Sequence, residues 1–277
     1  MQFLILDLET TGLDKNKDRI LAGGFYDDSS NKFRVEYQPF SARTISSLGD
    51  AETTKIGHNI GFDTGFLVKA GYKVRGTLLD TRTLVFQFNP YNKLKLKELG
   101  KSLFNKEVIE FKSTFGQLLD IKDQVVMIKK HGKERQFSIG ILESYIKQDI
   151  EITKALFDLF YGKSGEWFNT VELTLQSIIC DMENNGMYVD IQKIAELDRI
   201  WSNKINEIES AYELNLRSPK QVMSYLGAVT GNNPRSTDKI SLMELSGNVP
   251  EANGILEHRE LSTLVSRYTK PFLSGCT

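Results

Sequence analysis

Cysteine and long apolar runs are what this chain of 277 residues lacks most clearly. Its 2 cysteines, Cys180 and Cys276, cannot form a disulfide framework or a four-cysteine metal site, and Cys180 lies on the apolar face of a predicted helix. No apolar run approaches the roughly 20 residues that span a bilayer, and the apolar N-terminus has no basic flank. We therefore expect a cytoplasmic protein without a signal peptide or a membrane contact.

The chain also lacks an excess of positive charge, since its formal net charge is −1. A basic domain is the usual sign of strong non-specific nucleic-acid binding, so the balance argues weakly against that class. It does not exclude a nuclease, because metal-binding carboxylates lower the net charge and their cations reverse the local sign. Basic residues do gather in two runs, each of which is equally well explained as a solvated surface: Lys93, Lys95, Lys97, Lys101 and Lys106, and Lys129, Lys130, Lys133 and Arg135.

Carboxylates are present in three separated clusters, of which Asp7 and Glu9 form the first. They end a predicted strand at alternate positions, so both side chains point to the same face. Two neighbouring carboxylates at the end of a buried strand repel each other and lose hydration, and a divalent cation would remove both costs. A strand that simply ends in solvent is an equally good explanation. The tight turn Thr10–Leu13 favours a site, because it would place backbone amides and Leu13 beside the carboxylates.

Asp63 forms the second cluster, and Tyr145 with Asp149 forms the third. Asp63 follows Asn59 by four residues on the first turn of a predicted helix, where the helix dipole alone favours an acid. Tyr145 and Asp149 are i, i+4 neighbours and share one helix face, as a half-buried tyrosine on an amphipathic helix also would. Together, however, the three clusters predict a site that holds two divalent cations and performs phosphodiester chemistry.

The first 165 residues mix strands and helices, which predicts a mixed sheet with helices on its faces. A helix is expected to start at Asn59 as its N-cap and to end by Gly71, and another to run over 139–161. A hairpin at 124–139 turns at His131-Gly132. The remaining strands are predicted at 2–8, 19–26, 32–38, 54–57 and 76–80.

The stretch Gly162–Gly165 is the predicted domain boundary, because everything after it is helical in pattern. One amphipathic helix ends at Gly186, and the next begins at the N-cap Asp190. Ser218 with Pro219 starts a further helix. A polar loop is expected at 232–239, and Pro250 opens the last helix. We therefore predict an α/β domain at 1–165 and an all-helical domain at 166–277.

The three clusters resemble the motifs of the proofreading 3′→5′ exonucleases of the DEDD superfamily, whose fold is ribonuclease H-like. The match is Asp-x-Glu at Asp7, Asn-x-x-Phe-Asp ending at Asp63, and Tyr-x-x-x-Asp ending at Asp149. The tyrosine spacing marks the DEDDy branch, since the alternative branch has histidine where this chain has Ser144.

The resemblance implies a catalytic role for five residues and two divalent cations, Mg²⁺ or Mn²⁺, as cofactors. Asp7, Glu9 and Asp149 would hold one metal, and Asp7 with Asp63 the second. Tyr145 with Glu9 would orient the attacking water. The expected substrate is a single-stranded or frayed DNA 3′ end, bound through the backbone of Thr10, the side chain of Leu13 and Asn59.

The resemblance extends to the family A DNA polymerases, the bacterial DNA polymerase I family. Met182–Asp190 is similar to the entry motif of that family's polymerase region, and Asn215–Gln221 and Leu256–Leu261 resemble its thumb. The palm and finger motifs are missing from this chain. The resemblance thus implies a 3′→5′ exodeoxyribonuclease in a bacterial or phage-infected cell, the proofreading part of a split or truncated polymerase. A separate chain would carry the palm and fingers, and this chain alone would incorporate no nucleotides.

Two alternatives stay open at this stage. The first is a ribonuclease of the same superfamily similar to ribonuclease D, which a comparison of RNA and DNA degradation would distinguish. The second is a non-catalytic subunit that binds DNA for a polymerase, which a test of metal-dependent cleavage would distinguish.

Overall fold

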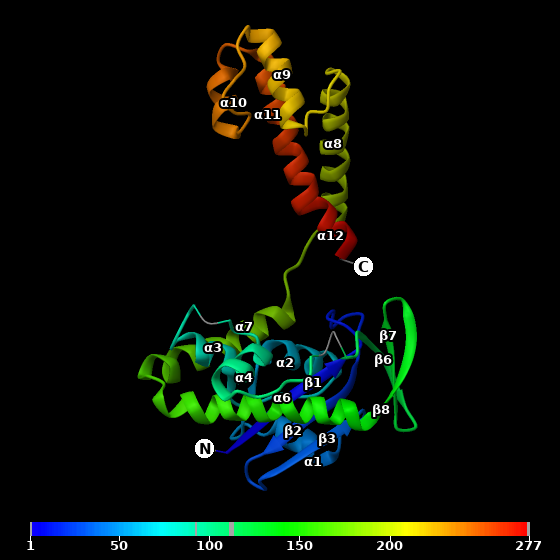
Figure 1. Cartoon of the computed structure of the whole chain (residues 1–277), viewed down its shortest axis with the longest axis vertical. Coiled ribbons are helices and arrows are strands. Elements are labelled where there is room, and N and C mark those ends of the chain that lie inside the picture. Colours follow the sequence, from blue (N-terminus) through cyan, green and yellow to red (C-terminus); the bar gives the residue numbers. More distant parts are fainter. Residues whose placement is uncertain (1, 92, 111–113, 276–277) are drawn as a thin grey trace. The chain divides into compact units, whose positions relative to one another are not determined.

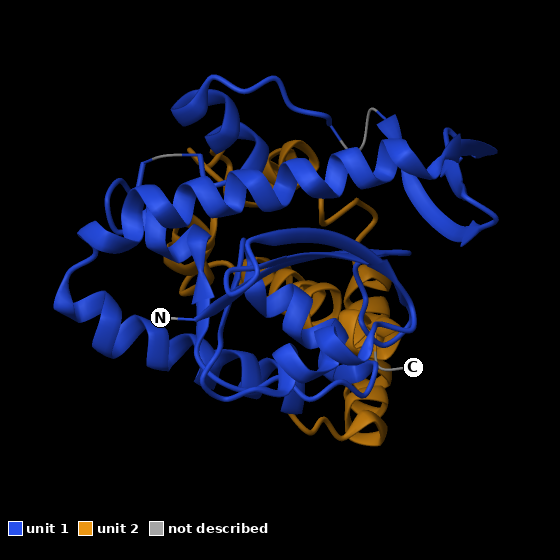
Figure 2. Ribbon diagram, turned by 90° about the horizontal axis from the view of Figure 1, so that it is seen from below, with its two compact units in different colours: residues 1–186 blue, residues 187–277 orange. Residues whose placement is uncertain are grey.

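The computed structural model describes residues 2–91, 93–110 and 114–275 (Figure 1). It forms two compact units, residues 1–186 and residues 187–277 (Figure 2). The two units therefore meet at Gly186, and not at Gly165 where the sequence predicted the domain boundary.

Residues 166–186 belong to unit 1 because their apolar side chains complete its core. Cys180 is buried in a cluster with Leu67, as its place on an apolar helix face predicts, and Phe168 is buried in a second cluster with Leu79. These residues lie on α7 (Leu173–Asn185) and on the π-helical turn Phe168–Glu172 before it. Cys276 lies outside the described residues.

A five-stranded mixed sheet of order β3-β2-β1-β4-β5 forms the centre of unit 1. Its middle strand β1 pairs antiparallel with β2 and parallel with β4, β2 pairs antiparallel with β3, and β4 pairs parallel with β5. Leu4 and Leu6 of β1 enter one core cluster while Phe3 and Ile5 enter another, so β1 is buried on both faces, as its continuous apolar run predicts. This order and orientation confirm the expected ribonuclease H-like fold. The strands are β1 (Phe3–Thr10), β2 (Ile20–Asp27), β3 (Lys32–Tyr37), β4 (Thr54–Gly57) and β5 (Leu78–Asp80).

The long helix α6 (Ile139–Phe160) packs against this sheet and carries the third carboxylate cluster. Gly24 on β2 makes the approach possible, because a Cβ there would collide with Ile146 and press on Ile150. α6 therefore lies close to β1 and β2. The other helices of the unit before α7 are α1 (Ala42–Gly49), α2 (Ile60–Lys69), α3 (Thr81–Phe86) and α4 (Leu96–Phe104), with a 3₁₀ turn at Tyr161–Lys163.

A three-stranded antiparallel sheet of β6 (Gln117–Lys122), β7 (Val125–Lys130) and β8 (Lys133–Ser138) extends unit 1. The predicted hairpin is confirmed as β7 and β8, with His131 and Gly132 at φ 51° and 75° in its turn. β6 was not predicted, because the turn that joins it to β7 is Asp123-Gln124 and has no glycine, although both residues adopt positive φ.

Asn59 occupies the N-cap position of α2, but it does so in the left-handed conformation and its side chain accepts no capping hydrogen bond. The expected position is therefore confirmed, whereas side-chain capping is not what holds the residue there. At the other end of α2, Gly71 has φ 88° directly after the C-cap residue Ala70.

Unit 2 is all-helical, as predicted. Asp190 and Ser218 cap α8 and α9 by accepting hydrogen bonds from the backbone N–H groups of Lys193 and Gln221 at 3.0 and 3.4 Å. α10 begins at Lys239, the last residue of the predicted loop. The helices are α8 (Ile191–Ser210), α9 (Pro219–Thr230), α10 (Lys239–Ser246), α11 (Pro250–Leu264) and α12 (Lys270–Gly275), with a π-helical turn at Val265–Thr269.

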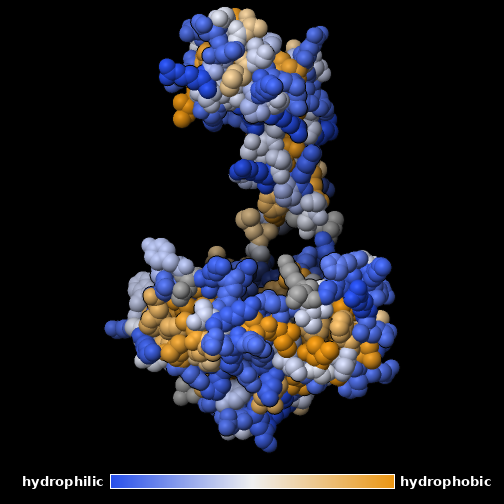
Figure 3. Space-filling model, viewed as in Figure 1, coloured by the Kyte–Doolittle hydropathy of each residue, from blue (hydrophilic) through white to orange (hydrophobic). Residues whose placement is uncertain are grey.

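The surface of unit 1 mixes polar and apolar residues, shown blue and orange in Figure 3. Phe86 and Phe88 are among its exposed apolar side chains. Some exposed apolar side chains are ordinary for a globular protein. Across the described part of the chain, no helix is both long and apolar enough to cross a membrane.

Candidate active site

All eight residues that the sequence singled out line one cavity of unit 1, with a volume of about 440 Å³. The end of β1 and the turn after it supply four of them, the start of α2 supplies two, and α6 supplies two. Three elements that are distant in sequence therefore converge at one place. In chain order the residues are Asp7, Glu9, Thr10, Leu13, Asn59, Asp63, Tyr145 and Asp149.

The carboxylates of Asp7, Glu9 and Asp149 form the centre of this cavity. One oxygen from each lies within 4.8 Å of one from each of the others. Glu9 and Asp149 are buried, and Asp7 is half-buried. A compact set of carboxylate oxygens is the ligand set that Mg²⁺ and Mn²⁺ prefer, so these three residues fit a divalent metal.

Asp63 lines the same cavity but stands outside that group of three. It is buried, and its Oδ1 accepts a hydrogen bond of 2.9 Å from the backbone N–H of Leu8. This bond ties the first turn of α2 to β1, between the two carboxylates of the first cluster. It engages one of the two carboxylate oxygens.

The concentration of acids raises their pKa values. Burial raises the pKa of Asp7 well above its usual range, and the charges of Asp149, Asp63 and Glu9 add to the rise. Burial also raises the pKa of Glu9 well above its usual range, and the charge of Asp149 adds to this rise. Burial raises the pKa of Asp63 to about 8. A divalent cation would favour the charged forms of all these groups and so oppose the rise.

Tyr145 lies beside the group of three. Burial raises the pKa of its hydroxyl, and the neighbouring charges of Asp149 and Glu9 raise it further. The phenol therefore keeps its proton at neutral pH and acts through hydrogen bonds. Its ring packs edge-on against the buried ring of Phe115, with the centroids 5.8 Å apart, which fixes the orientation of the side chain.

Lys97 is a site residue that the sequence did not distinguish from its basic run. Its Nζ contacts Oδ1 of Asp149 and lies 4.0 Å from the centre of the Tyr145 ring. Burial raises the pKa of Asp149, and the Lys97 ammonium opposes that rise. The sequence could have distinguished Lys97 through its position on the helix. Lys97 and Gly100 are three residues apart and so share one face of α4, and Gly100 packs against α6.

The turn after β1 forms the mouth of the cavity. The hydroxyl of Thr10 donates a hydrogen bond of 2.6 Å to the carbonyl of Gly12, and Gln117 of β6 donates one of 3.1 Å to the carbonyl of Thr11. The side chain of Leu13 is 86% exposed. An anchored turn thus presents one apolar side chain beside the carboxylates, where a base could pack.

His58 and Asn59 also line the cavity. His58 is held by Thr81 and by the carbonyl of Leu94, at 2.9 and 2.7 Å from its two ring nitrogens, so it joins α3 to the segment before α4. The backbone N–H of Asn59 donates to Oδ1 of Asp80 at 2.9 Å. Both contacts are structural. The side chain of Asn59 is exposed at the cavity, and its Oδ1 accepts a hydrogen bond of 3.4 Å from Arg82.

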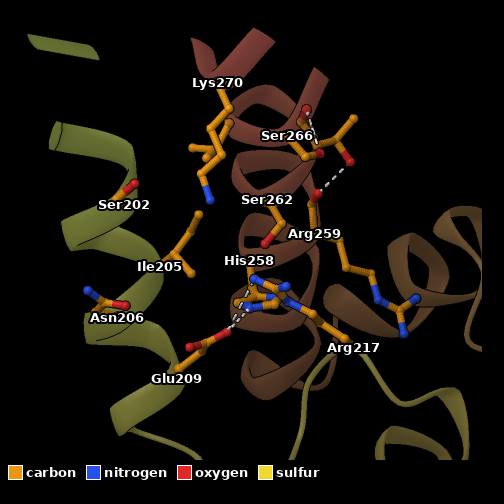
Figure 4. A pocket seen from close by; sticks show the side chains of 12 residues that line it. Ser202, Ile205, Asn206, Glu209, Arg217, His258, Arg259, Ser262, Ser266 and Lys270 are labelled. Atoms are coloured by element: carbon orange, nitrogen blue, oxygen red, sulfur yellow. Dashed lines mark hydrogen bonds and ion pairs between the residues drawn. The ribbon is translucent and has the colours of Figure 1, made fainter. Parts of the chain in front are cut away.

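Unit 2 contains a cavity of about 550 Å³ between α8 and the segment from α11 to α12 (Figure 4). His258 is completely buried at its wall, and its Nε2 lies 2.8 Å from Oε1 of Glu209. Within the described residues, Nδ1 of His258 has no hydrogen-bond partner. Arg217 and Lys270 also line the cavity, so it combines a buried histidine with positive charge.

The chain is similar to DNA polymerase I over nearly its whole length, although no protein-family model matches it. It is 26% identical to DNA polymerase I of Helicobacter pylori, covering 94% of this chain and 30% of that protein. It is 22% identical to DNA polymerase I of Borreliella burgdorferi, covering 97% of this chain and 31% of that protein. The chain therefore spans about a third of the curated relatives that it matches.

Among solved structures, the chain resembles the POL domain of Pol1 from M. smegmatis, in a complex with DNA primer-template and dNTP. The TM-score is 0.69 at 17% sequence identity, and the match covers 99% of this chain and 47% of the other. At this identity the likeness concerns the fold.

Proposed function

We propose that this chain is a metal-dependent 3′→5′ exonuclease that removes nucleoside monophosphates from DNA. The observation that carries the proposal is the meeting of Asp7, Glu9 and Asp149 with Tyr145 in one cavity of unit 1. Similarity to DNA polymerase I supports DNA rather than RNA as the substrate, and a role in proofreading.

Asp7, Glu9 and Asp149 would hold one divalent cation, and Asp7 with Asp63 a second. Bound there, such cations would supply an activated water and stabilise the leaving 3′ oxygen. Tyr145 stays protonated and would orient that water together with Glu9. Glu9, Asp63 and Asp149 are buried, and electrostatic interactions are stronger in such surroundings than in bulk water.

The cavity would bind one terminal nucleotide. Its volume of about 440 Å³ lies in the range of small-ligand sites. Leu13 would pack against the base, and the backbone of Thr10 would contact the sugar and phosphate. A paired terminus must first be unstacked to enter, so single-stranded or frayed ends should be preferred.

Digestion of single-stranded DNA labelled at its 5′ end, with Mg²⁺ or Mn²⁺, tests this proposal. The expected product is a descending ladder that excess chelator abolishes. Asp7→Asn should remove the activity, whereas Asp158→Asn, on an exposed part of α6, should not. Cleavage that survives the chelator or starts at the 5′ end contradicts the proposal. Faster degradation of an RNA strand of the same sequence favours the ribonuclease D-like alternative.

We further propose that unit 2 binds duplex DNA as a thumb would, without chemistry of its own. Lys220, Arg235 and Arg267 are exposed and available to phosphates, while Arg259 is half-buried and donates to the carbonyl of Thr237. Lys239 is engaged by Glu260 at 2.7 Å.

Affinity for primer-template duplex should then fall with salt, with a log–log slope of roughly −0.9 per phosphate contact. Residues 1–186 alone should lose this affinity. Equal duplex binding by residues 1–186 and by the whole chain contradicts a thumb-like role. It favours a docking surface for a separate chain that carries the palm and fingers.

A further inference from the structure

Lys97 reaches the carboxylate cluster from α4. Its Nζ contacts Oδ1 of Asp149, lies 3.5 Å from Oε1 of Gln148, and sits 4.0 Å from the centre of the Tyr145 ring. The side chain is 13% exposed. A lysine ammonium is costly to remove from water without a partner, so its position depends on the negative charge that it meets there.

α4 holds Lys97 in this direction through close packing on α6. Leu99 is buried, and a Cβ at Gly100 would collide with Ile152 of α6, so the two helices approach closely at this point. The other lysines of the same run behave differently. Lys101 is paired with Glu110 at 2.5 Å, and both of these side chains are 51% exposed.

The position of Lys97 conflicts with metal binding. Asp149 is one of the three carboxylates that fit a divalent cation, and its Oδ1 is the atom that Lys97 contacts. A divalent cation seated among these oxygens would lie a few ångströms from the ammonium, and like charges at that distance repel strongly inside a protein. Lysine has a flexible four-carbon stem and can move its charge away while its helix stays in place.

We propose that Lys97 is an internal counter-ion of the metal-free carboxylate cluster, and that it leaves Asp149 when a divalent cation binds. This inference rests on one part of the proposed function, namely that Asp7, Glu9 and Asp149 hold a divalent cation. It has two consequences of opposite sign. Lys97 stabilises the metal-free protein by offsetting the repulsion among Asp7, Glu9 and Asp149, and it weakens metal binding by competing for one ligand.

Titration of the full chain with Mn²⁺, followed by calorimetry, tests the second consequence without any measure of catalysis. Lys97→Met should bind Mn²⁺ at least ~10-fold more tightly than the wild type, a difference of about 1.4 kcal/mol. Lys97→Arg keeps the charge and should stay within ~2-fold of the wild type, a margin that corresponds to about 0.4 kcal/mol. Lys154→Met, at an exposed ion pair with Asp158 on α6, is the matched control and should show no change.

Thermal unfolding in excess chelator tests the first consequence. Lys97→Met should unfold at a lower temperature than the wild type, and saturating Mn²⁺ should abolish that difference. Lys97→Gln serves the same purpose if the methionine variant does not fold, because its amide also lacks the charge.

Unchanged or weaker Mn²⁺ binding by the neutral variants overturns the proposal, since Lys97 would then orient Asp149 permanently or play no part. Unchanged or higher stability of these variants in chelator overturns it equally. A wild type that binds no Mn²⁺ refutes the proposed function as well as the displacement. In that case the unfolding measurement still decides whether Lys97 acts as a counter-ion.

Discussion

Replacing Asp63 by asparagine should remove nuclease activity and yet make the metal-free protein more stable. Asp63 is buried, and burial raises its pKa from 3.8 to about 8. Asparagine has nearly the same shape, and its side-chain oxygen can still accept the hydrogen bond that Leu8 donates to Oδ1 at 2.9 Å. The substitution therefore removes a buried acid while keeping its principal contact.

The stabilisation follows from the direction of the pKa shift. Between about pH 4 and about pH 8 the native protein retains a proton on Asp63 that the unfolded chain releases. Each pH unit crossed then lowers the stability of the wild type by about 1.4 kcal/mol. The Asp63→Asn variant does not lose this stability, because asparagine has no proton to release in this pH range. Its advantage should be close to zero near pH 4, on the order of 4 kcal/mol at pH 7, and constant above about pH 8.

Urea unfolding in excess chelator, at several pH values between about 4.5 and 8, measures this difference. Asp158→Asn is a suitable control, because Asp158 forms an exposed ion pair of 2.6 Å with Lys154 on the same helix as Asp149, and such pairs contribute little. Should Asp63→Asn be less stable than the wild type at pH 8 without metal, the neighbours of Asp63 must favour its charged form. The reasoning from burial would then be wrong.

Three further outcomes are expected. Asp7→Ala should abolish cleavage of labelled DNA, whereas Tyr145→Phe should slow it by ~10²–10⁴-fold, because the hydroxyl only positions water; equal losses would contradict this division of roles. Mn²⁺ should raise the unfolding temperature more at pH 8 than at pH 5, since the raised pKa values of Asp7 and Glu9 favour their protonated forms at the lower pH, where protons compete with the cation. A chain ending at Gly186 should fold and cleave DNA, while one ending at Gly165 should unfold at a lower temperature because it lacks Cys180 and the rest of α7.

The site residues could be predicted from the sequence because each cluster obeys a local rule. Asp7 and Glu9 alternate on a strand, and Tyr145 and Asp149 are one helical turn apart, so each pair faces one way whatever surrounds it. The convergence of the clusters does not follow from these rules, and was predicted from the combination of the three clusters and from the family resemblance. The structure places all of them at one cavity, which is the part that periodicity alone does not provide.

The parts that the sequence did not predict depend on contacts between distant segments. Lys97 belongs to a run of lysines that differ little in sequence, and only the packing of α4 on α6 separates it from Lys101. The boundary at Gly165 followed a glycine-rich stretch, but the core contacts of Cys180 place α7 in unit 1. β6 was missed because its turn uses Asp123-Gln124, whose positive φ values have no glycine to signal them.

The arrangement of unit 1 makes folding and site assembly one event. The four acids come from β1, α2 and α6, and none of these elements brings two clusters together by itself. Packing of α6 on β2 at Gly24 sets the position of Asp149, and the bond from Leu8 to Asp63 sets that of α2. Each of these contacts brings like charges closer together, so the apolar core stabilises an arrangement that electrostatics opposes. A cation relieves that opposition, and metal affinity in this protein should therefore measure how firmly the sheet and its helices hold the acids together.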